Sequence, residues 1–135
     1  MLFIIMAANC SHCVHFKEMY INNGILEQKF ADIPHKFLFY DTMEEAKHSS
    51  DIPEEVREYL RWFPFICVNE KDRFVVFNGR VEGHELVSVR PGVPPTPENL
   101  LFFYQRGNHR SEDVSHHSSP GFIPTRINVN SFGGK

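Results

Sequence analysis

The sequence predicts an α/β fold, a four-stranded mixed sheet with flanking helices in the order β-α-β-α-β-β-α. Three observations support this prediction. A short apolar run opens the chain, apolar residues at helical spacing follow it directly, and two β-rich runs further on are separated only by a turn. The chain has 135 residues, of which 41% are hydrophobic, and this is enough for one domain with a packed core.

The first strand and the first helix are recognised by a change of period. Residues 2–7 form an apolar run with two isoleucines, which is typical of a buried strand. After Ser11 the spacing becomes helical, and one helical face is expected to carry Cys13, Phe16, Met19 and Tyr20. The sequence Asn-Asn-Gly at 22–24 stops or kinks this helix, and residues 25–30 are expected to resume it.

The next segments predict a second strand and a second helix. Residues 36–40 read as a strand, and the polar stretch that follows to Ser50 reads mostly as loop, with room for one helical turn. Pro53 suits the first turn of a helix, and two glutamates after it favour the positive end of the helix dipole. The apolar stripe of this helix is expected to comprise Val56, Tyr59 and Leu60.

A hairpin and a final helix complete the predicted fold. Residues 65–68 and 73–77 are β-rich runs around a polar turn, which predicts an antiparallel hairpin that ends at 78–79. Residues 80–95 are less regular and include Gly83, Gly92 and two consecutive prolines. Residues 96–98, Thr-Pro-Glu, supply an N-cap, a proline at the first helical position and an acid in the first turn. The buried side of this last helix is expected to comprise Leu100, Leu101, Phe103 and Tyr104.

After Gly107 the composition shifts towards Ser, His, Asn and Gly. We therefore expect one folded domain over residues 1–107 and a flexible polar tail over residues 108–135. The formal net charge of −3 and the scattered basic residues predict neither nucleic acid nor an anionic membrane as a partner. The opening apolar run lacks a positively charged segment before it and is too short to span a bilayer, so a cytoplasmic protein is expected.

The most informative local feature is the pair Cys10 and Cys13, which encloses Ser-His and lies between a predicted strand and a predicted helix. Free N–H groups and the dipole at a helix start favour a thiolate at Cys10. Cys13 lies one turn further on, within reach of Cys10 and more buried. This arrangement is typical of a nucleophile with a resolving thiol. Zinc sites use the same spacing, but they need further ligands, and no second pair with suitable spacing occurs in residues 1–107. The third cysteine, Cys67, reads as a small buried hydrophobe, and the odd count argues against a disulfide-stapled scaffold.

The chain resembles the thioredoxin superfamily in its dithiol, in Pro64 at the start of the third strand and in the final β-β-α unit. The resemblance covers residues 2–107 and corresponds to the minimal, glutaredoxin-sized core. It implies that the Phe63–Pro64 peptide bond is cis and that Pro64 lies near the two cysteines. It also implies that the backbone of Phe63 pairs with an extended substrate peptide and that Gly79 forms a third side of the groove.

One other position supports this resemblance, and two depart from it. His12, just before the second cysteine, is placed as in protein disulfide isomerases, where it stabilises the reduced pair. The family's usual tryptophan before the first cysteine is Asn9 here, and the buried acid of the preceding strand is replaced by Ile4. No glutathione-binding signature is evident, so no glutathione dependence is expected.

The sequence therefore predicts a thiol–disulfide oxidoreductase that acts on protein disulfides or dithiols, with a recycling reductase or oxidase as its second partner. The two thiols carry the electrons, so neither an organic cofactor nor a metal is expected. The alternative is a thioredoxin-fold interaction module with a vestigial or structural dithiol. Metal binding by Cys10 and Cys13 with His12 or His15 ranks last. Compact members of the superfamily occur in cells and in large DNA viruses, so a place in a virion is the alternative to the cytoplasm.

Overall fold

The computed structural model describes residues 1–107, and the tail expected at 108–135 lies outside the described residues. The chain divides into two compact units, Met1–Ile66 and a second that begins at Cys67. The elements are, in order, β1 (Leu2–Ala7), α1 (Ser11–Phe16), a π-helical turn η1 (Lys17–Ile21), α2 (Ile25–Lys29), β2 (His35–Tyr40), α3 (Met43–Lys47), α4 (Glu54–Arg57), β3 (Phe65–Glu70), β4 (Arg73–Val76), β5 (Gly79–Glu82), β6 (Glu85–Ser88) and α5 (Pro97–Arg106).

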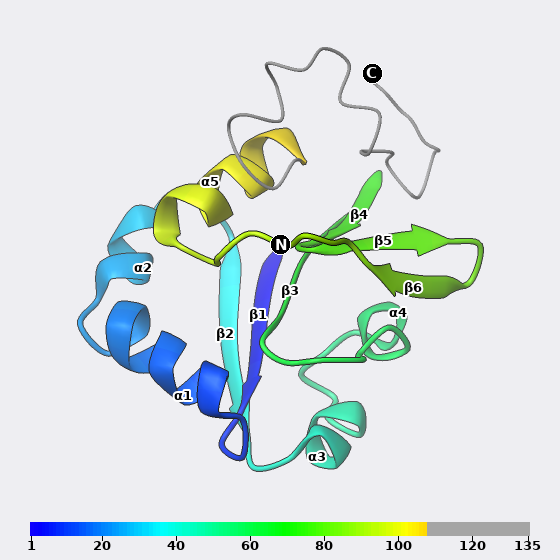
Figure 1. The fold of residues 1–135 in the computed structure, drawn as a ribbon, viewed down its shortest axis with the longest axis horizontal. Helices are drawn as coiled ribbons and strands as arrows, with labels where there is room; N and C mark the ends of the chain where they lie inside the picture. Colours follow the sequence, from blue (N-terminus) through cyan, green and yellow to red (C-terminus); the bar gives the residue numbers. More distant parts are fainter. Residues whose placement is uncertain (108–135) are drawn as a thin grey trace. The chain divides into compact units, whose positions relative to one another are not determined.

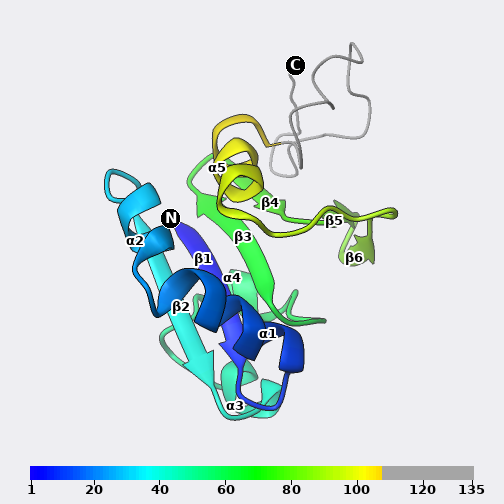
Figure 2. The ribbon, with the colours of Figure 1, turned by 60° about the vertical axis from the view of Figure 1, so that its left-hand side comes forward.

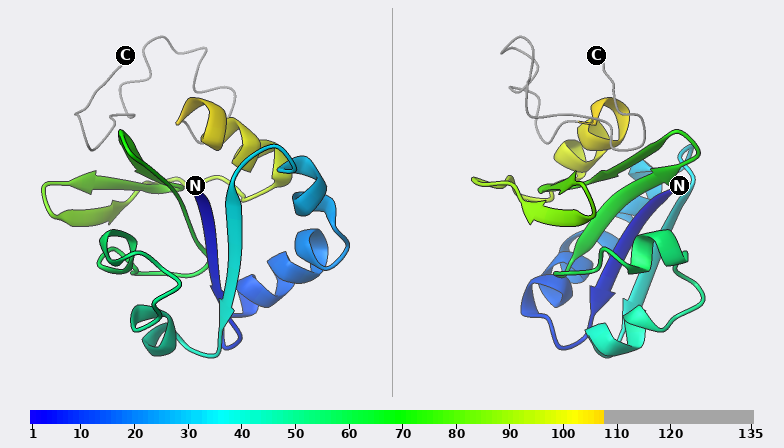
Figure 3. Two further views of the ribbon diagram at one scale, coloured as in Figure 1. Left: turned by 180° about the vertical axis from the view of Figure 1, so that it is seen from behind. Right: turned by 90° about the vertical axis from the view of Figure 1, so that its right-hand side faces the viewer.

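The first unit is built on β1 and β2, which pair in parallel from Leu2 opposite His35 to Ala7 opposite Tyr40 (Figure 1). All six residues of β1 are buried. Figures 2 and 3 show why: α1 and α2 lie on one face of this strand pair, and α3 and α4 lie on the opposite face. Because helices cover both faces, β1 reads as a continuous apolar run instead of an alternating one.

The first helix follows the prediction up to Phe16 and departs from it afterwards. Cys13 and Phe16 are buried, and Tyr20 contacts the Phe16 ring edge-on at 5.4 Å between centroids. Met19, expected on the same face, is 42% exposed. The π-helical turn η1 explains the difference, since its wider i to i+5 spacing shifts the phase of the side chains. The predicted stop is confirmed, and Gly24 there adopts a φ of 79°.

The segment from 41 to 61 contains two short helices. Thr42 caps α3 by accepting the Glu45 N–H at 3.2 Å, and α3 is the helical turn for which the sequence left room in a stretch expected to be mostly loop. The predicted second helix starts after Pro53 as expected but ends at Arg57, before the predicted stripe is complete. Leu60 is nevertheless fully buried, because the turn that follows α4 still directs it inward.

The predicted hairpin is confirmed. β3 and β4 pair antiparallel, from Cys67 opposite Val76 to Glu70 opposite Arg73. The four strands form a mixed sheet in the order β2-β1-β3-β4, so the predicted α/β class with a four-stranded mixed sheet is also confirmed.

The hairpin ends before Asn78 as predicted, but the two strands that follow it, in a stretch expected to be less regular, were not predicted. β5 and β6 form a second, two-stranded antiparallel sheet, with Gly79 opposite Ser88 (Figure 3). Asn78 precedes it with a φ of 61°, and its side-chain amide donates to the Val93 carbonyl and accepts the Val93 N–H. These two hydrogen bonds join the residues before and after the β5–β6 hairpin, and no local sequence pattern predicts them.

The last helix is as predicted. Thr96 caps α5 by accepting the Asn99 N–H at 3.2 Å, and Gly107 ends the helix with a φ of 79°. Phe103 is fully buried and meets the Phe77 ring edge-on at 5.3 Å. The other three expected side chains range from buried at Leu100 to half-buried at Leu101 and Tyr104. Among the helices of residues 1–107, none is both long and apolar enough to cross a membrane.

Candidate active site

Cys10 lies where β1 ends and α1 begins. A turn at Ala8 and Asn9 leads into it, and its own N–H donates to the Ala7 carbonyl at 3.2 Å. Its backbone is extended, with φ −114° and ψ 112°, as is usual for an N-cap. The thiol therefore takes the place of the Ser or Asp side chain that most often caps a helix. The Sγ atom accepts the Cys13 N–H at 3.2 Å.

The second cysteine occupies the first turn of α1 and is fully buried. Burial raises the pKa of the Cys13 thiol to about 12, and hydrogen bonding to the Cys10 side chain adds to the increase. A hydrogen bond with the Ala7 backbone acts in the opposite direction. The half-buried Cys10 and the buried Cys13 thus differ in access to solvent, as the sequence predicts for a nucleophile and a resolving thiol.

Phe63 and Pro64 reach the dithiol from a distant part of the sequence, immediately before β3. The Cys10 thiol donates to the Phe63 carbonyl at 3.7 Å. The Phe63–Pro64 bond is cis, as the resemblance implies. Both residues are half-buried, so part of each is open to solvent beside the exposed edge of Cys10.

The remaining predicted site residues are not brought to the dithiol in the same way. His12 is exposed at the second position of α1, and no hydrogen bond or ion pair ties it to any part of residues 1–107. Gly79 is buried at the start of β5 in the second unit, and its place in a groove with Pro64 stays a prediction. The tuning role of His12 likewise stays a prediction.

The two departures from the family pattern have clear positions. Asn9 is exposed in the turn before Cys10, and Ile4 is fully buried in the middle of β1. Within residues 1–107 no charged or polar side chain is buried, so no carboxylate occupies the interior behind Cys13. The proton of the Cys13 thiol must therefore leave through water or an exposed group.

Over the described residues, no group of three or more His, Cys, Asp or Glu side chains is arranged to hold a metal ion. Cys10 and Cys13 come together without a third ligand of these types.

One surface feature was not anticipated from the sequence. Helices α3 and α4 and the turn after α4 line a charged pocket that includes Lys47, Arg57 and Arg61. The spacing of Arg57 and Arg61, four residues apart, was a possible signal, because residues at i and i+4 share a helix face. This spacing indicates the pocket only weakly, because Arg61 lies beyond the end of α4.

Comparison with known proteins adds no assignment to this geometry: no family model, no curated protein and no solved structure matches the chain.

Proposed function

We propose that this chain is a thioredoxin-like thiol–disulfide oxidoreductase with Cys10 as its nucleophile and Cys13 as its resolving thiol. The observation that carries the proposal is the bond between the Cys13 N–H and Cys10 Sγ at the start of α1, with Cys13 itself fully buried. An N–H donor at a helix N-terminus stabilises an anionic sulfur more than a neutral one. The arrangement thus places an accessible sulfur, which accepts this donor, beside an inaccessible thiol.

In the first step, the Cys10 thiolate attacks one sulfur of a substrate disulfide. A sulfur–sulfur bond forms between Cys10 and the substrate, and the original disulfide bond breaks. The departing substrate thiolate takes a proton from water. The product of this step is a mixed disulfide at Cys10.

In the second step, Cys13 loses its proton to water and attacks Cys10 Sγ, one helical turn away. The Cys10–Cys13 bond forms, the mixed disulfide breaks, and the second substrate sulfur leaves and is protonated. The substrate has gained two electrons and two protons, and the dithiol has lost them. The same steps in reverse oxidise a substrate dithiol. A second protein must restore the starting state, and no organic cofactor takes part.

The neighbourhood of Phe63 and Pro64 supports a polypeptide substrate. The Phe63 carbonyl lies at the nucleophile, and the two half-buried side chains lie beside it. An extended peptide that places its disulfide at Cys10 can pair with the backbone here. A cytoplasmic location remains part of the same proposal.

The decisive experiment measures reduction of a protein disulfide by the full chain and by single-cysteine variants. Cys10→Ser is expected to abolish the reaction, because the attacking sulfur is lost. Cys13→Ser is expected to stop at the mixed disulfide, which mass spectrometry detects. Cys67→Ala is the matched control, and its rate should equal that of the wild type. Activity that survives in Cys10→Ser excludes this mechanism.

A second candidate is a thioredoxin-fold interaction module with a structural dithiol. The pKa of about 12 at Cys13, together with the absence of a buried carboxylate in residues 1–107, favours it, because both slow the resolving step. A redox titration in glutathione buffers separates the two candidates. A dithiol that cycles between its oxidised and reduced forms supports the oxidoreductase, and one that does not supports the interaction module.

A further inference from the structure

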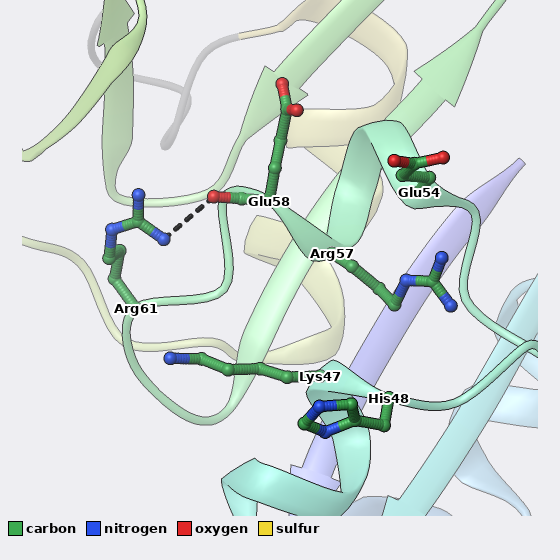
Figure 4. A pocket seen from close by; sticks show the side chains of 6 residues that line it. All are labelled: Lys47, His48, Glu54, Arg57, Glu58 and Arg61. Atoms are coloured by element: carbon green, nitrogen blue, oxygen red, sulfur yellow. Dashed lines mark hydrogen bonds between the residues drawn. The ribbon is translucent and has the colours of Figure 1, made fainter.

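The pocket on α3 and α4 is a charged feature of the first unit that the proposed reaction does not use. Its volume is about 550 Å³, within the range of pockets that hold ligands. Figure 4 shows the six side chains that line it, which are Lys47, His48, Glu54, Arg57, Glu58 and Arg61. All of them belong to the first unit, which also contains Cys10 and Phe63.

The balance of charge in this pocket is positive, although the chain as a whole has a formal charge of −3. Three permanent cations, on Lys47, Arg57 and Arg61, face two carboxylates. None of these cations forms an ion pair within residues 1–107. The Arg57 guanidinium donates to the Ser49 carbonyl, and that of Arg61 donates to two carbonyls of its own turn. The Lys47 ammonium has no hydrogen-bond partner among the same residues. Three positive charges are therefore available to a ligand.

The positive and negative side chains of the pocket also point to different sides of it. In Figure 4 the ends of Lys47 and Arg61 extend to the same side of the pocket, whereas the carboxylates of Glu54 and Glu58 point away from that side. Both Lys47 and Arg61 are exposed and can adjust to a ligand. An anionic group that enters between these two cations meets no carboxylate of the pocket first.

This cationic side lies close to the proposed nucleophile along the chain. Arg61 is two residues before Phe63, and two residues span at most about 7 Å. The Phe63 carbonyl in turn is 3.7 Å from Cys10 Sγ. A peptide bound at Cys10 therefore needs only a few further residues to reach the pocket.

We propose that Lys47 and Arg61 bind the carboxylates of an acidic segment next to the reacting cysteine of a polypeptide substrate. The inference rests on the proposed function and names the class of substrate for it. Charge complementarity of this kind raises the rate of encounter and discriminates against basic partners. Each exposed ion pair contributes little, so the preference is expected to be moderate.

The test uses the reduced full chain and three disulfide-linked peptide dimers that are identical except for glutamate, glutamine or lysine beside the single cysteine. The single-turnover rate constant is followed by quenching and thiol alkylation. The glutamate peptide is expected to react about three- to tenfold faster than the glutamine peptide. This ratio should fall towards one at about 0.5 M salt, where exposed charges are screened.

Variants connect the preference to the pocket. In a Lys47→Gln/Arg61→Gln double variant the glutamate and glutamine peptides should react equally fast, and in Lys47→Glu/Arg61→Glu the lysine peptide should become the fastest. Lys36→Gln, which removes an exposed cation of β2 outside the pocket, should retain the wild-type preference. A reversal cannot result from poor folding. Equal wild-type rates for glutamate and glutamine peptides, or an equal loss for both in the double variant, overturn the inference.

Two further measurements separate this inference from the proposed function. Reaction with bis(2-hydroxyethyl) disulfide, which carries no charge, reports on the dithiol alone, and a failure there contradicts the oxidoreductase. Binding of a cysteine-free glutamate peptide, measured by fluorescence anisotropy, reports on the pocket alone. Wild-type binding that the double variant loses supports the pocket, and equal binding by both proteins contradicts it.

Discussion

At the scale of single residues, the two cysteines of the candidate site show how one helical turn creates two environments. Cys10 caps the helix from outside its first turn, so its sulfur remains half-exposed and accepts a backbone N–H. Cys13 is in the first turn on the face that meets the core, and its side chain has no access to solvent. The spacing of the motif thus decides which of the two thiols is open to solvent.

The raised pKa of Cys13 predicts a strong pH dependence of the resolving step. The thiolate fraction of Cys13 increases about tenfold per pH unit until the pH reaches the pKa of about 12. Burial, the largest cause of the shift, persists in a mixed disulfide at Cys10, so the decay of that species should continue to accelerate as the pH rises from 8 to 9. Stopped samples analysed by mass spectrometry give the rate, and Cys13→Ser is the control without the internal nucleophile. A rate that levels off below pH 9 contradicts the assigned pKa.

Asn78 is a second residue whose conformation carries a prediction. Its backbone φ of 61° is unusual for a residue other than glycine, and its side-chain amide makes two hydrogen bonds to Val93. Asn78→Ala loses both bonds and retains the unfavourable φ, so urea denaturation should show a loss of about 1–3 kcal/mol. Asn78→Gly loses the bonds without the conformational penalty and should lose less. An Asn78→Ala variant as stable as the wild type excludes this role.

At the scale of elements, features that depend on neighbours in the chain were predicted correctly, whereas features that depend on pairing with another segment were not. The start of α5 can be predicted from Thr96, Pro97 and Glu98, because capping depends only on neighbours in the chain. In contrast, β5 and β6 are four residues each and acquire strand character by pairing with each other. Short segments of this kind have too few apolar positions to show a period. The end of the expected apolar face at Met19 has a similar origin, since a π-helical turn is not visible in the spacing.

The N-cap of α5 gives the prediction that belongs to this scale. Thr96→Ala removes the acceptor of the Asn99 N–H and should reduce the free energy of unfolding by about 1 kcal/mol in urea titrations. Thr96→Ser retains the hydroxyl and should remain close to the wild type. If the alanine and serine variants unfold at the same urea concentration, the cap does not stabilise this helix.

At the scale of the whole molecule, β1 connects the core of the first unit to the dithiol. Its six buried residues are covered by helices on both faces, and the chain passes from its carboxyl end directly to Cys10 (Figure 2). The proposed nucleophile is therefore positioned by the most deeply buried strand of that unit. Stability and site geometry depend on the same segment.

Truncation of a central side chain of β1 tests this dependence. Ile5 is fully buried, and Ile5→Ala should reduce the free energy of unfolding by about 2–5 kcal/mol through lost burial and the cavity left behind. Lys36→Gln on the exposed surface of β2 should change it by less than about 0.5 kcal/mol. Urea denaturation compares the two variants, and a shift of equal size in both contradicts the central place of β1.

The candidate site was predictable only in part. The dithiol, its helix and the proline opposite it were recognisable because each has a local motif or a family pattern. The charged pocket was not, because Lys47 and Arg61 come from either side of a loop and α4, and the path of that loop is not visible in the sequence pattern. Which surface residues share a pocket depends on how the connecting turns fold.

The sequence by itself determined the α/β class, the hairpin of β3 and β4, the limits of α5 and the place of Cys10 at a helix start. These features depend on periodicity and on contacts between near neighbours, which the order of residues records directly. Only the tertiary structure decided that Phe63 meets Cys10 across 53 positions of sequence, that Cys13 is buried enough to raise its pKa, and that cations gather on α3 and α4. Burial and long-range contact depend on packing between distant segments, and no local pattern encodes them.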